Sequence, residues 1–511
     1  MTALGGKAVT ALASPTVELA RARGLAARSG IAWVDLDDER VDARAVAKVP
    51  LELMARFVAF PYAIEDGTLK VALADPATGP LLAREVPVPL EFVVASRASI
   101  AALLDSLRHT RRRHGSLIAV ASMAELGAEP EMALIKRAAD VGATDLHFIP
   151  TEAGLSIRAR IDGVLREIAS VDDTASATAA ISRLKVRARL DIAENRRAQE
   201  GRMRIVTDVG REFDVRLTII PTIAGEGAAV RLLEHDARPP SLSEVGLSVE
   251  HQLELERVVN RRRGALLVTG PTGSGKSTTI HAALMDIAVP ELDIVTVEDP
   301  VEYRFDGVYQ IEVNPAIGIT FESALRTILR TDPDIVAVGE MRDLDTASTT
   351  LKAALSGTFV LSTLHTFDAP AAITRLLDIG VEPYVIAATV NAVVAQRLVR
   401  RLCIYCRKRH PVTHVERVEL GLGDGEHHLF SAEGCEQCDR GYRGLLGVQQ
   451  LMVLDDDLRR LALERAPHAH ILDAARARGM RTLLEDGAAK ALAGLTTLDE
   501  LRHAIAADTA L

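Results

Sequence analysis

The sequence has 511 residues, of which 48% are hydrophobic, 25% are charged and only 3% are aromatic, and its formal net charge is −10. This length predicts about three or four domains, since a domain usually has ~100–200 residues. The composition is that of a soluble globular protein and excludes a disordered chain. The acidic balance argues against a dedicated nucleic-acid binder, which needs a concentrated basic surface to neutralise phosphates.

Membrane and targeting signals are missing from the sequence as given. No apolar run approaches about 18 residues, and residues 1–10 lack a charged start that leads into an apolar signal core. We therefore expect a cytoplasmic protein that reaches a membrane only through partners. All four cysteines lie between residues 403 and 438, as two C-x-x-C pairs. In a reducing compartment, such clustering indicates a metal site rather than disulfides.

Residues 1–107 predict a small N-terminal α/β module without recognisable chemistry. Apolar residues recur at helical spacing near the start, and the pattern predicts a helix over Leu51–Phe60 and a strand over Leu69–Leu73. The arginine run 111–113 follows in a linker-like stretch. A solvated hinge is favoured there over a patch that binds lipid or nucleic acid.

Residues 108–236 predict a second, arginine-rich α+β module. A helix over Met132–Val141 is followed by an alternating strand that ends at the turn Asp162-Gly163, which indicates a β-hairpin. Two later strands carry Arg216 and Arg231. Taken alone, each of these arginines is most simply explained as a surface ion pair.

Pro239 and Pro240 mark a linker over residues 237–247, because paired prolines cannot continue either neighbouring element. Residues 248–511 then alternate short, fully apolar runs with helical patterns. This alternation predicts an α/β domain with a parallel sheet that is buried on both faces. The expected strands include Ile294–Val297, Ile335–Val338 and Phe359–Thr363.

Residues 270–277 fit the phosphate-loop pattern G-x-x-x-x-G-K-[ST] in full, between a strand-like run and a helix-like stretch. The glycines let backbone N–H groups face the phosphates, and the helix N-terminus adds positive potential. Lys276 would reach the β- and γ-phosphates of ATP, and Ser277 would bind Mg²⁺. The nucleotide-binding residues expected here are Gly270, Pro271, Thr272, Gly273, Ser274, Gly275, Lys276, Ser277 and Thr278.

Polar side chains follow the expected strands, at the edge where open α/β sheets bind their ligands. Glu340 is expected to polarise the attacking water, and His365 to sense the γ-phosphate. Glu298 and Asp299 are expected to help Ser277 hold Mg²⁺. For each, the alternative is an N-cap or an ion-pair residue at a strand end. The expected catalytic residues are Lys276, Glu298, Glu340 and His365.

The cysteines Cys403, Cys406, Cys435 and Cys438 supply two thiolate pairs, the pattern of a closed tetrahedral zinc site. Their 28-residue gap exceeds the commonest spacing of about 15–20 residues, so we expect a protruding subdomain over residues 398–445. Four thiolates leave no open coordination position. Zinc would therefore support folding rather than catalysis.

Four sequence boxes in this order resemble the secretion ATPase superfamily, and within it the type II secretion ATPases and the type IV pilus assembly ATPases. These boxes are the phosphate loop, the acidic box Val297–Glu302, the Walker B segment within 329–343 and the histidine box Leu361–Thr366. The likeness extends from about residue 130 to 505 and includes the four cysteines.

The resemblance implies a RecA-like P-loop ATPase core preceded by a PAS-like α+β domain. It also implies a homohexamer that binds Mg-ATP between these two modules, with zinc as a structural ion. The arginines that match the family's phosphate-contacting set are Arg216, Arg231, Arg326, Arg330 and Arg342.

The resemblance also implies partners and a place in the cell. The motor would sit peripherally at the inner membrane, on an adaptor protein (GspL-like) and a platform protein (GspF-like), and would drive pseudopilus assembly. The tetracysteine segment favours assembly motors over retraction motors. The N-terminal module lacks the full tandem motif that binds cyclic di-GMP in some relatives, so we expect no such binding.

Two other classes stay open beside a type II secretion motor or a pilus assembly motor. A nucleic-acid translocase on the same fold is disfavoured by the acidic balance and by the scarcity of aromatic residues for base stacking. An inactive scaffold is disfavoured by the intact Lys276, Ser277 and Glu340.

Overall fold

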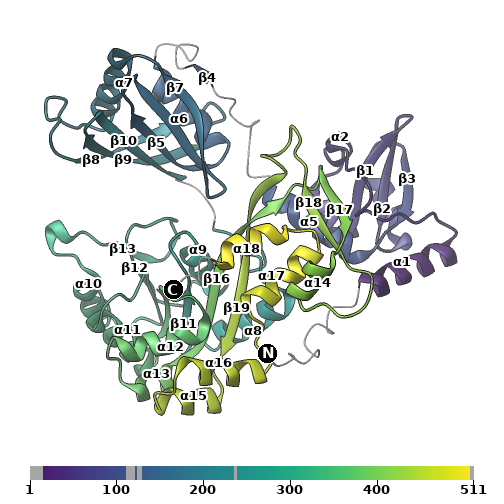
Figure 1. Cartoon of the computed structure of the whole chain (residues 1–511). Coiled ribbons are helices and arrows are strands. Elements are labelled where there is room, and N and C mark those ends of the chain that lie inside the picture. Colours follow the sequence, from purple (N-terminus) through teal and green to yellow (C-terminus); the bar gives the residue numbers. More distant parts are fainter. Residues whose placement is uncertain (1–14, 111–120, 123–128, 235–238, 507–511) are drawn as a thin grey trace. The chain divides into compact units, whose positions relative to one another are not determined.

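The computed structural model of the chain describes residues 15–110, 121–122, 129–234 and 239–506. The chain folds into two compact units (Figure 1). The first unit comprises residues 1–109, 239–301 and 305–511, and the second comprises residues 110–238 and 302–304. The arginine run 111–113 and residues 237 and 238 of the expected linker lie outside the described residues.

The first unit begins with a small module built on a three-stranded sheet. Its strand β2 pairs antiparallel with β1 and parallel with β3. The strands are β1 Ala59–Glu65, β2 Thr68–Leu73 and β3 Leu90–Val94. The helices are α1 Pro15–Ser29, α2 Ala43–Val46, α3 Leu51–Phe57, η1 Pro76–Thr78, α4 Gly79–Glu85 and α5 Arg97–Thr110.

The helix expected over Leu51–Phe60 is shorter than predicted. It ends at Phe57, because Val58 adopts the left-handed conformation, with φ of 47°, and caps the helix with its backbone N–H. The chain then turns into β1, where Phe60 is fully buried opposite Ala72. Burial of Phe60 between the sheet and its helices outweighs the helical pattern of the sequence.

In its described residues, the second unit is a seven-stranded sheet with two helices. The strand order is β4-β7-β6-β5-β10-β9-β8. The strands are β4 Ala121–Ser122, β5 Ala143–Pro150, β6 Leu155–Ile161, β7 Val164–Val171, β8 Gln199–Val206, β9 Glu212–Thr222 and β10 Gly225–Glu234, and the helices are α6 Pro130–Asp140 and α7 Thr174–Arg187. The predicted hairpin is confirmed, since Asp162 and Gly163 both take positive φ and join β6 to β7.

The remainder of the first unit is organised by a seven-stranded sheet, ordered β13-β12-β14-β15-β11-β16-β19. All neighbouring strands are parallel except β16 and β19. The strands are β11 Gly264–Thr269, β12 Ile294–Glu298, β13 Tyr309–Glu312, β14 Ile335–Val338, β15 Phe359–Leu364, β16 Val390–Leu402 and β19 Tyr442–Val453. The predicted strands are confirmed, and β11, β12, β14 and β15 are buried along their whole length.

Helices cover both faces of this sheet, as its continuous apolar strands require. Leu266 and Val268 of β11 face a core that includes α8 and α9, whereas Leu267 faces a core that includes α11–α13, α15 and α16. The helices of this part are α8 Val249–Asn260, α9 Lys276–Ile287, η3 Pro315–Ile317, α10 Phe321–Ile328, α11 Leu344–Ser356, α12 Ala369–Asp378, α13 Pro383–Thr389, α15 Asp456–Leu463, α16 His468–Ala477, α17 Leu483–Leu492 and α18 Leu498–Ala506.

The four cysteines lie in the segment between β16 and β19. This segment contains the two-stranded sheet of β17 and β18 and one short helix. Its elements are β17 Arg407–Pro411, α14 His414–Glu419 and β18 His428–Ala432. Among the described residues, no helix combines the length and the apolar character that a membrane span needs.

Candidate functional site

The predicted phosphate loop connects the end of β11 to the start of α9. Gly270, Gly273 and Gly275 all have positive φ, which side-chain-bearing residues rarely adopt. A Cβ on Gly270 would stand only 2.4 Å from the Gln396 carbonyl oxygen. Glycine is therefore required at this position by both backbone conformation and space.

Lys276 is the first residue of α9, and its side chain turns back into the loop. Its Nζ donates hydrogen bonds of 3.0 Å to the carbonyl oxygens of Gly270 and Pro271. Burial lowers the pKa of Lys276, while the nearby Glu340 carboxylate opposes this shift. Ser277 is exposed beside it at the helix N-terminus, where a phosphate or its cation would be received.

Strand β16 also holds the phosphate loop in place through side-chain hydrogen bonds. Gln396 of β16 is buried, and its Nε2 donates a 2.7 Å hydrogen bond to the Ser274 carbonyl oxygen. Its Oε1 accepts a 2.7 Å hydrogen bond from the hydroxyl of Thr279 on α9. The next residue, Arg397, donates to the carbonyl oxygens of Gln396 and Phe367.

Gln396 and Arg397 were missed by the sequence reasoning. The available signal was a polar pair at 396 and 397 that interrupts an apolar run in a predicted motor domain. Only the pairing of β16 with β11 brings this pair beside the phosphate loop.

Glu340 and His365 lie together, as expected for residues that follow two adjacent parallel strands. Glu340 follows β14 and His365 follows β15, and these strands pair in parallel. Nε2 of His365 is 3.3 Å from Oε2 of Glu340. Arg342 forms an ion pair with the other Glu340 oxygen, and this hydrogen bond raises the pKa of Arg342. The cluster therefore brings a carboxylate, an imidazole and a guanidinium together near Lys276.

Glu298 is buried and hydrogen-bonded inside the fold, unlike a carboxylate that is free to bind a metal ion. Its carboxylate is buried, and Oε2 lies 2.9 Å from Nε2 of His281 on α9. Oε1 accepts hydrogen bonds of 2.6 Å from Thr296 and 3.1 Å from Gln310. The neighbouring Asp299 is exposed. The magnesium role of Glu298 and Asp299 stays a prediction, and the structure gives Glu298 three side-chain partners inside the fold.

The five predicted arginines divide between the units. Arg216 and Arg231 face each other across β9 and β10 in the second unit, and Arg231 forms a 3.1 Å ion pair with Asp145. In the first unit, Arg342 joins Glu340, whereas Arg326 pairs with Glu322 one turn earlier on α10. Arg330 is exposed just beyond the end of α10. Their contacts with nucleotide stay predictions.

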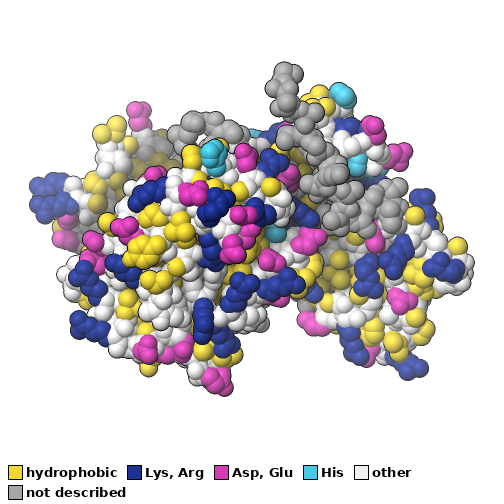
Figure 2. All heavy atoms as spheres, turned by 90° about the horizontal axis from the view of Figure 1, so that it is seen from below, with side chains coloured by type: hydrophobic (Ala, Val, Ile, Leu, Met, Phe, Trp, Pro, Cys, Tyr) yellow, Lys and Arg dark blue, Asp and Glu magenta, His cyan; other side chains and the backbone are white. Residues whose placement is uncertain are grey.

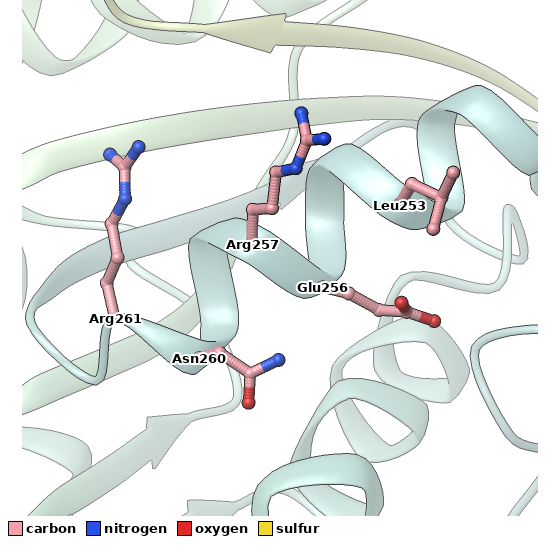
Figure 3. Close-up of a pocket in the computed structure, with 5 residues that line it drawn as sticks. All are labelled: Leu253, Glu256, Arg257, Asn260 and Arg261. Carbon is pink, nitrogen blue, oxygen red and sulfur yellow. The ribbon is translucent and has the colours of Figure 1, made fainter.

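The surface also has an open hollow that does not involve the phosphate loop. It is lined by one side of α8, as Figure 3 shows, and contains no phosphate-loop residue. Its residues are Leu253, Glu256, Arg257, Asn260 and Arg261. On the face drawn in Figure 2, the Lys and Arg side chains of the described residues are interspersed with Asp and Glu side chains.

The four cysteines converge as a metal site requires. Their Sγ atoms all lie within 4.8 Å of one another. Sγ distances are 3.8 Å for Cys403 to Cys435 and 3.6 Å for Cys406 to Cys438. Zinc–sulfur bonds of about 2.3 Å in a tetrahedron place sulfur atoms about 3.8 Å apart, so the set fits zinc.

The surroundings also suit thiolates that bind a cation. Burial raises the pKa of Cys403 and of Cys406 in the absence of a positive charge, so a cation is needed to keep these sulfurs deprotonated. Backbone N–H groups of Cys435 and Gly441 each lie 3.2 Å from Sγ of Cys438, where they donate to the sulfur. Such donors are the usual outer support of a metal–thiolate site.

A parallel sheet with a phosphate loop at the end of β11 and a carboxylate after β14 defines this chain as a P-loop ATP hydrolase. Within the P-loop ATP hydrolases, the sequence matches one particular family. Residues 128–503 match the family described as Type II/IV secretion system protein, and the chain belongs to that family. Residues 29–114 match the MshEN domain.

Known relatives agree with this assignment. The chain is 37% identical over 504 residues to the Type II secretion system protein E of Xanthomonas campestris pv. campestris, covering 90% of this chain and 87% of that protein. It is 36% identical over 508 residues to the Type IV pilus assembly ATPase PilB of Thermus thermophilus, covering 94% of this chain and 57% of PilB. The Legionella pneumophila ATPase DotB has the same fold, with a TM-score of 0.54 at 20% identity over 73% of this chain and 95% of DotB.

Proposed function

We propose that this chain is a homohexameric, Mg²⁺-dependent ATPase that drives pseudopilus assembly in type II protein secretion. It works at the cytoplasmic face of the inner membrane, on a GspL-like adaptor and a GspF-like platform protein. The observation that carries the hydrolytic part is the position of Lys276, His365 and Glu340, which follow the neighbouring parallel strands β11, β15 and β14 at the same edge of the sheet. Identities of 37% to 44% with type II relatives support the secretion part.

The residues at this edge of the sheet have different roles in ATP hydrolysis. Water attacks the γ-phosphorus of ATP, the bond to the β–γ bridging oxygen breaks, and ADP and phosphate leave. Glu340 orients the water and accepts its proton, and Lys276 stabilises the charge that develops on the phosphate oxygens. His365 and Arg342 hold the Glu340 carboxylate in position. Mg²⁺, held with the help of Ser277, supplies further positive charge to the phosphates when it is bound.

Glu340→Gln tests the hydrolytic proposal. The variant should bind ATP with near-native affinity. Its rate of phosphate release should fall by roughly 100-fold or more, since general bases typically contribute 10²–10⁴-fold to the rate. Glu382→Gln at the start of α13 is the matched control, because it removes an exposed carboxylate of the same unit. Retained turnover in Glu340→Gln would remove Glu340 from this role.

Type IV pilus assembly is the second candidate. The PilB of Myxococcus xanthus is 34% identical to this chain and aligns with 93% of it and 89% of PilB. Capture of the adaptor from membranes separates the candidates, because recovery of a secretion adaptor supports type II secretion and recovery of a pilus adaptor supports assembly of pili.

The four cysteines support a structural zinc ion as part of this proposal. Metal analysis of the purified full chain should return one zinc per chain, and Cys435→Ser should lower both zinc content and thermal stability. A native protein without zinc would end the claim.

A further inference from the structure

The tetracysteine segment and the N-terminal module belong to the same compact unit and share an apolar core. Ile404 and Tyr405 stand between the first two cysteines of the sequence. Ile404 is only 6% exposed and belongs to the core cluster that contains Phe57, Phe60 and Leu107 of the N-terminal module, and Tyr405 packs against that cluster. The turn between Cys403 and Cys406 thus presents two apolar side chains to this module.

Arginines on both sides of this turn meet carboxylates of the N-terminal module. The first, Arg401, lies near the end of β16, is fully buried, and has Nη1 2.5 Å from Oδ2 of Asp105 on α5. Two more come from β17, which follows Cys406 directly. Nη2 of Arg407 is 2.7 Å from Oδ1 of Asp37, and Nη1 of Arg409 is 2.7 Å from Oδ2 of Asp35.

The arginines and carboxylates of this contact also have hydrogen-bond partners within their own parts of the chain. Arg407 donates a 2.8 Å hydrogen bond to the Gly494 carbonyl oxygen, and Nη2 of Arg409 lies 3.2 Å from Nδ1 of His428 on β18. On the opposite side, the hydroxyl of Ser99 donates a 3.2 Å hydrogen bond to Asp37. The two surfaces therefore keep complementary charges in fixed positions, which favours one register of docking.

The balance of forces allows this contact to open. A buried ion pair roughly breaks even, because desolvation of the charges offsets their attraction, and its main effect is on specificity. The apolar contribution of the segment is confined to Ile404 and Tyr405. Attachment therefore depends on how well the cysteine turn presents these two side chains.

We propose that the tetracysteine site is a metal-dependent latch for the N-terminal module. The occupied site fixes the Cys403–Cys406 turn, so that Ile404 and Tyr405 seat in the N-terminal core and the arginines meet Asp35, Asp37 and Asp105. Loss of the ion frees the turn, and the N-terminal module detaches while the ATPase sheet stays folded. The latch rests on the proposed zinc ion, and it goes beyond a purely local stabilising role.

Hydrogen exchange of the full chain, read by mass spectrometry, tests the latch. The reporters are amides of α5 and of residues 35–38, and the internal reference is the β11–β15 pair of the ATPase sheet. Removal of zinc by a chelator should speed exchange in both reporters by about tenfold and leave β11–β15 unchanged, since released segments open more often. Zinc content is measured on the same samples.

Point variants keep the cysteines intact, so they probe docking without the risk of unfolding the metal site. Arg409→Ala and Asp35→Asn should each speed exchange in α5 while one zinc per chain is retained. Lys408→Ala is the matched control, because Lys408 lies between the two arginines on β17 and pairs with Glu433 of the same segment. It should change neither zinc content nor α5 exchange.

Each of three results would overturn the latch. Complete zinc loss with unchanged exchange in α5 and in residues 35–38 would reduce the ion to a local role, and the zinc proposal would stand. Unchanged α5 exchange in both Arg409→Ala and Asp35→Asn would reject the docking surface. A native protein that contains no zinc would instead refute the metal proposal itself, and with it the metal dependence.

Discussion

Nε2 of His281 lies 2.9 Å from Oε2 of Glu298, and both side chains are buried. His281 belongs to α9, the helix that Lys276 begins, whereas Glu298 is the last residue of β12. The pair therefore ties the phosphate-loop helix to the strand that leads into the acidic box. Phe305 packs near the imidazole, with ring centroids 5.5 Å apart.

The first prediction concerns the stability that this pair provides. Burial raises the pKa of Glu298, but hydrogen bonds from His281, Thr296 and Gln310 outweigh it and lower the pKa below its ordinary value of 4.5. A carboxylate with a lowered pKa in the folded state stabilises the protein above its ordinary pKa, and this stability is lost as the pH falls through the folded value.

His281→Ala should therefore cost about 3 kcal/mol near neutral pH, because it leaves a buried carboxylate without its strongest partner. The difference in melting temperature from the native protein should shrink as the pH falls through the lowered folded-state pKa of Glu298, where the native carboxylate becomes protonated. His470→Ala on α16 is the control, because that imidazole is exposed. An equal loss at every pH would contradict the charge-based account.

Gln396→Ala should loosen the phosphate loop. The substitution removes the hydrogen bonds to Ser274 and Thr279, and a lost hydrogen bond to a buried group costs about 1–3 kcal/mol. We expect ATP affinity to fall by about tenfold or more, with a smaller effect on melting temperature, measured by titration with nucleotide. Gln252→Ala on α8 is the control, since its side chain bonds only to Glu256 in the described contacts. Native affinity in Gln396→Ala would contradict the clamp.

Gly270→Ala and Gly273→Ala form a matched pair within the loop. Both positions have positive φ, so alanine is strained at either one. A Cβ at Gly270 would also meet the Gln396 carbonyl oxygen at 2.4 Å, whereas a Cβ at Gly273 meets no atom within 4 Å. Gly270→Ala should therefore abolish nucleotide binding while Gly273→Ala only weakens it. Equal affinities would show that strain alone decides the outcome.

Lys490→Met should destabilise the ATPase domain. Lys490 is buried on α17, forms an ion pair with Asp486, and donates to Gly447 and Gln449. Removing one partner of a buried pair typically costs about 3–5 kcal/mol, because the remaining charge stays buried. Calorimetry should detect the loss, and the double variant Lys490→Met with Asp486→Leu should recover part of it. A double variant as unstable as the single one would argue against the uncompensated charge as the cause.

Short contiguous patterns determined much of the fold and part of the site. The phosphate loop, the apolar strands and the two cysteine pairs can each be recognised from a few neighbouring residues. The strands β12, β14 and β15 could be predicted because continuous apolar runs are typical of parallel sheets buried on both faces. The meeting of Glu340 with His365 followed from the rule that ligands lie at the carboxyl ends of such strands.

The tertiary structure alone decided which distant side chains become partners. Gln396 is 122 residues from Ser274, and Arg401 is 296 residues from Asp105. Even His281 and Glu298, only 17 residues apart, meet because α9 packs against the sheet. Local sequence specifies the conformation and polarity of each segment, but the register and packing of the sheets determine which buried polar groups find one another.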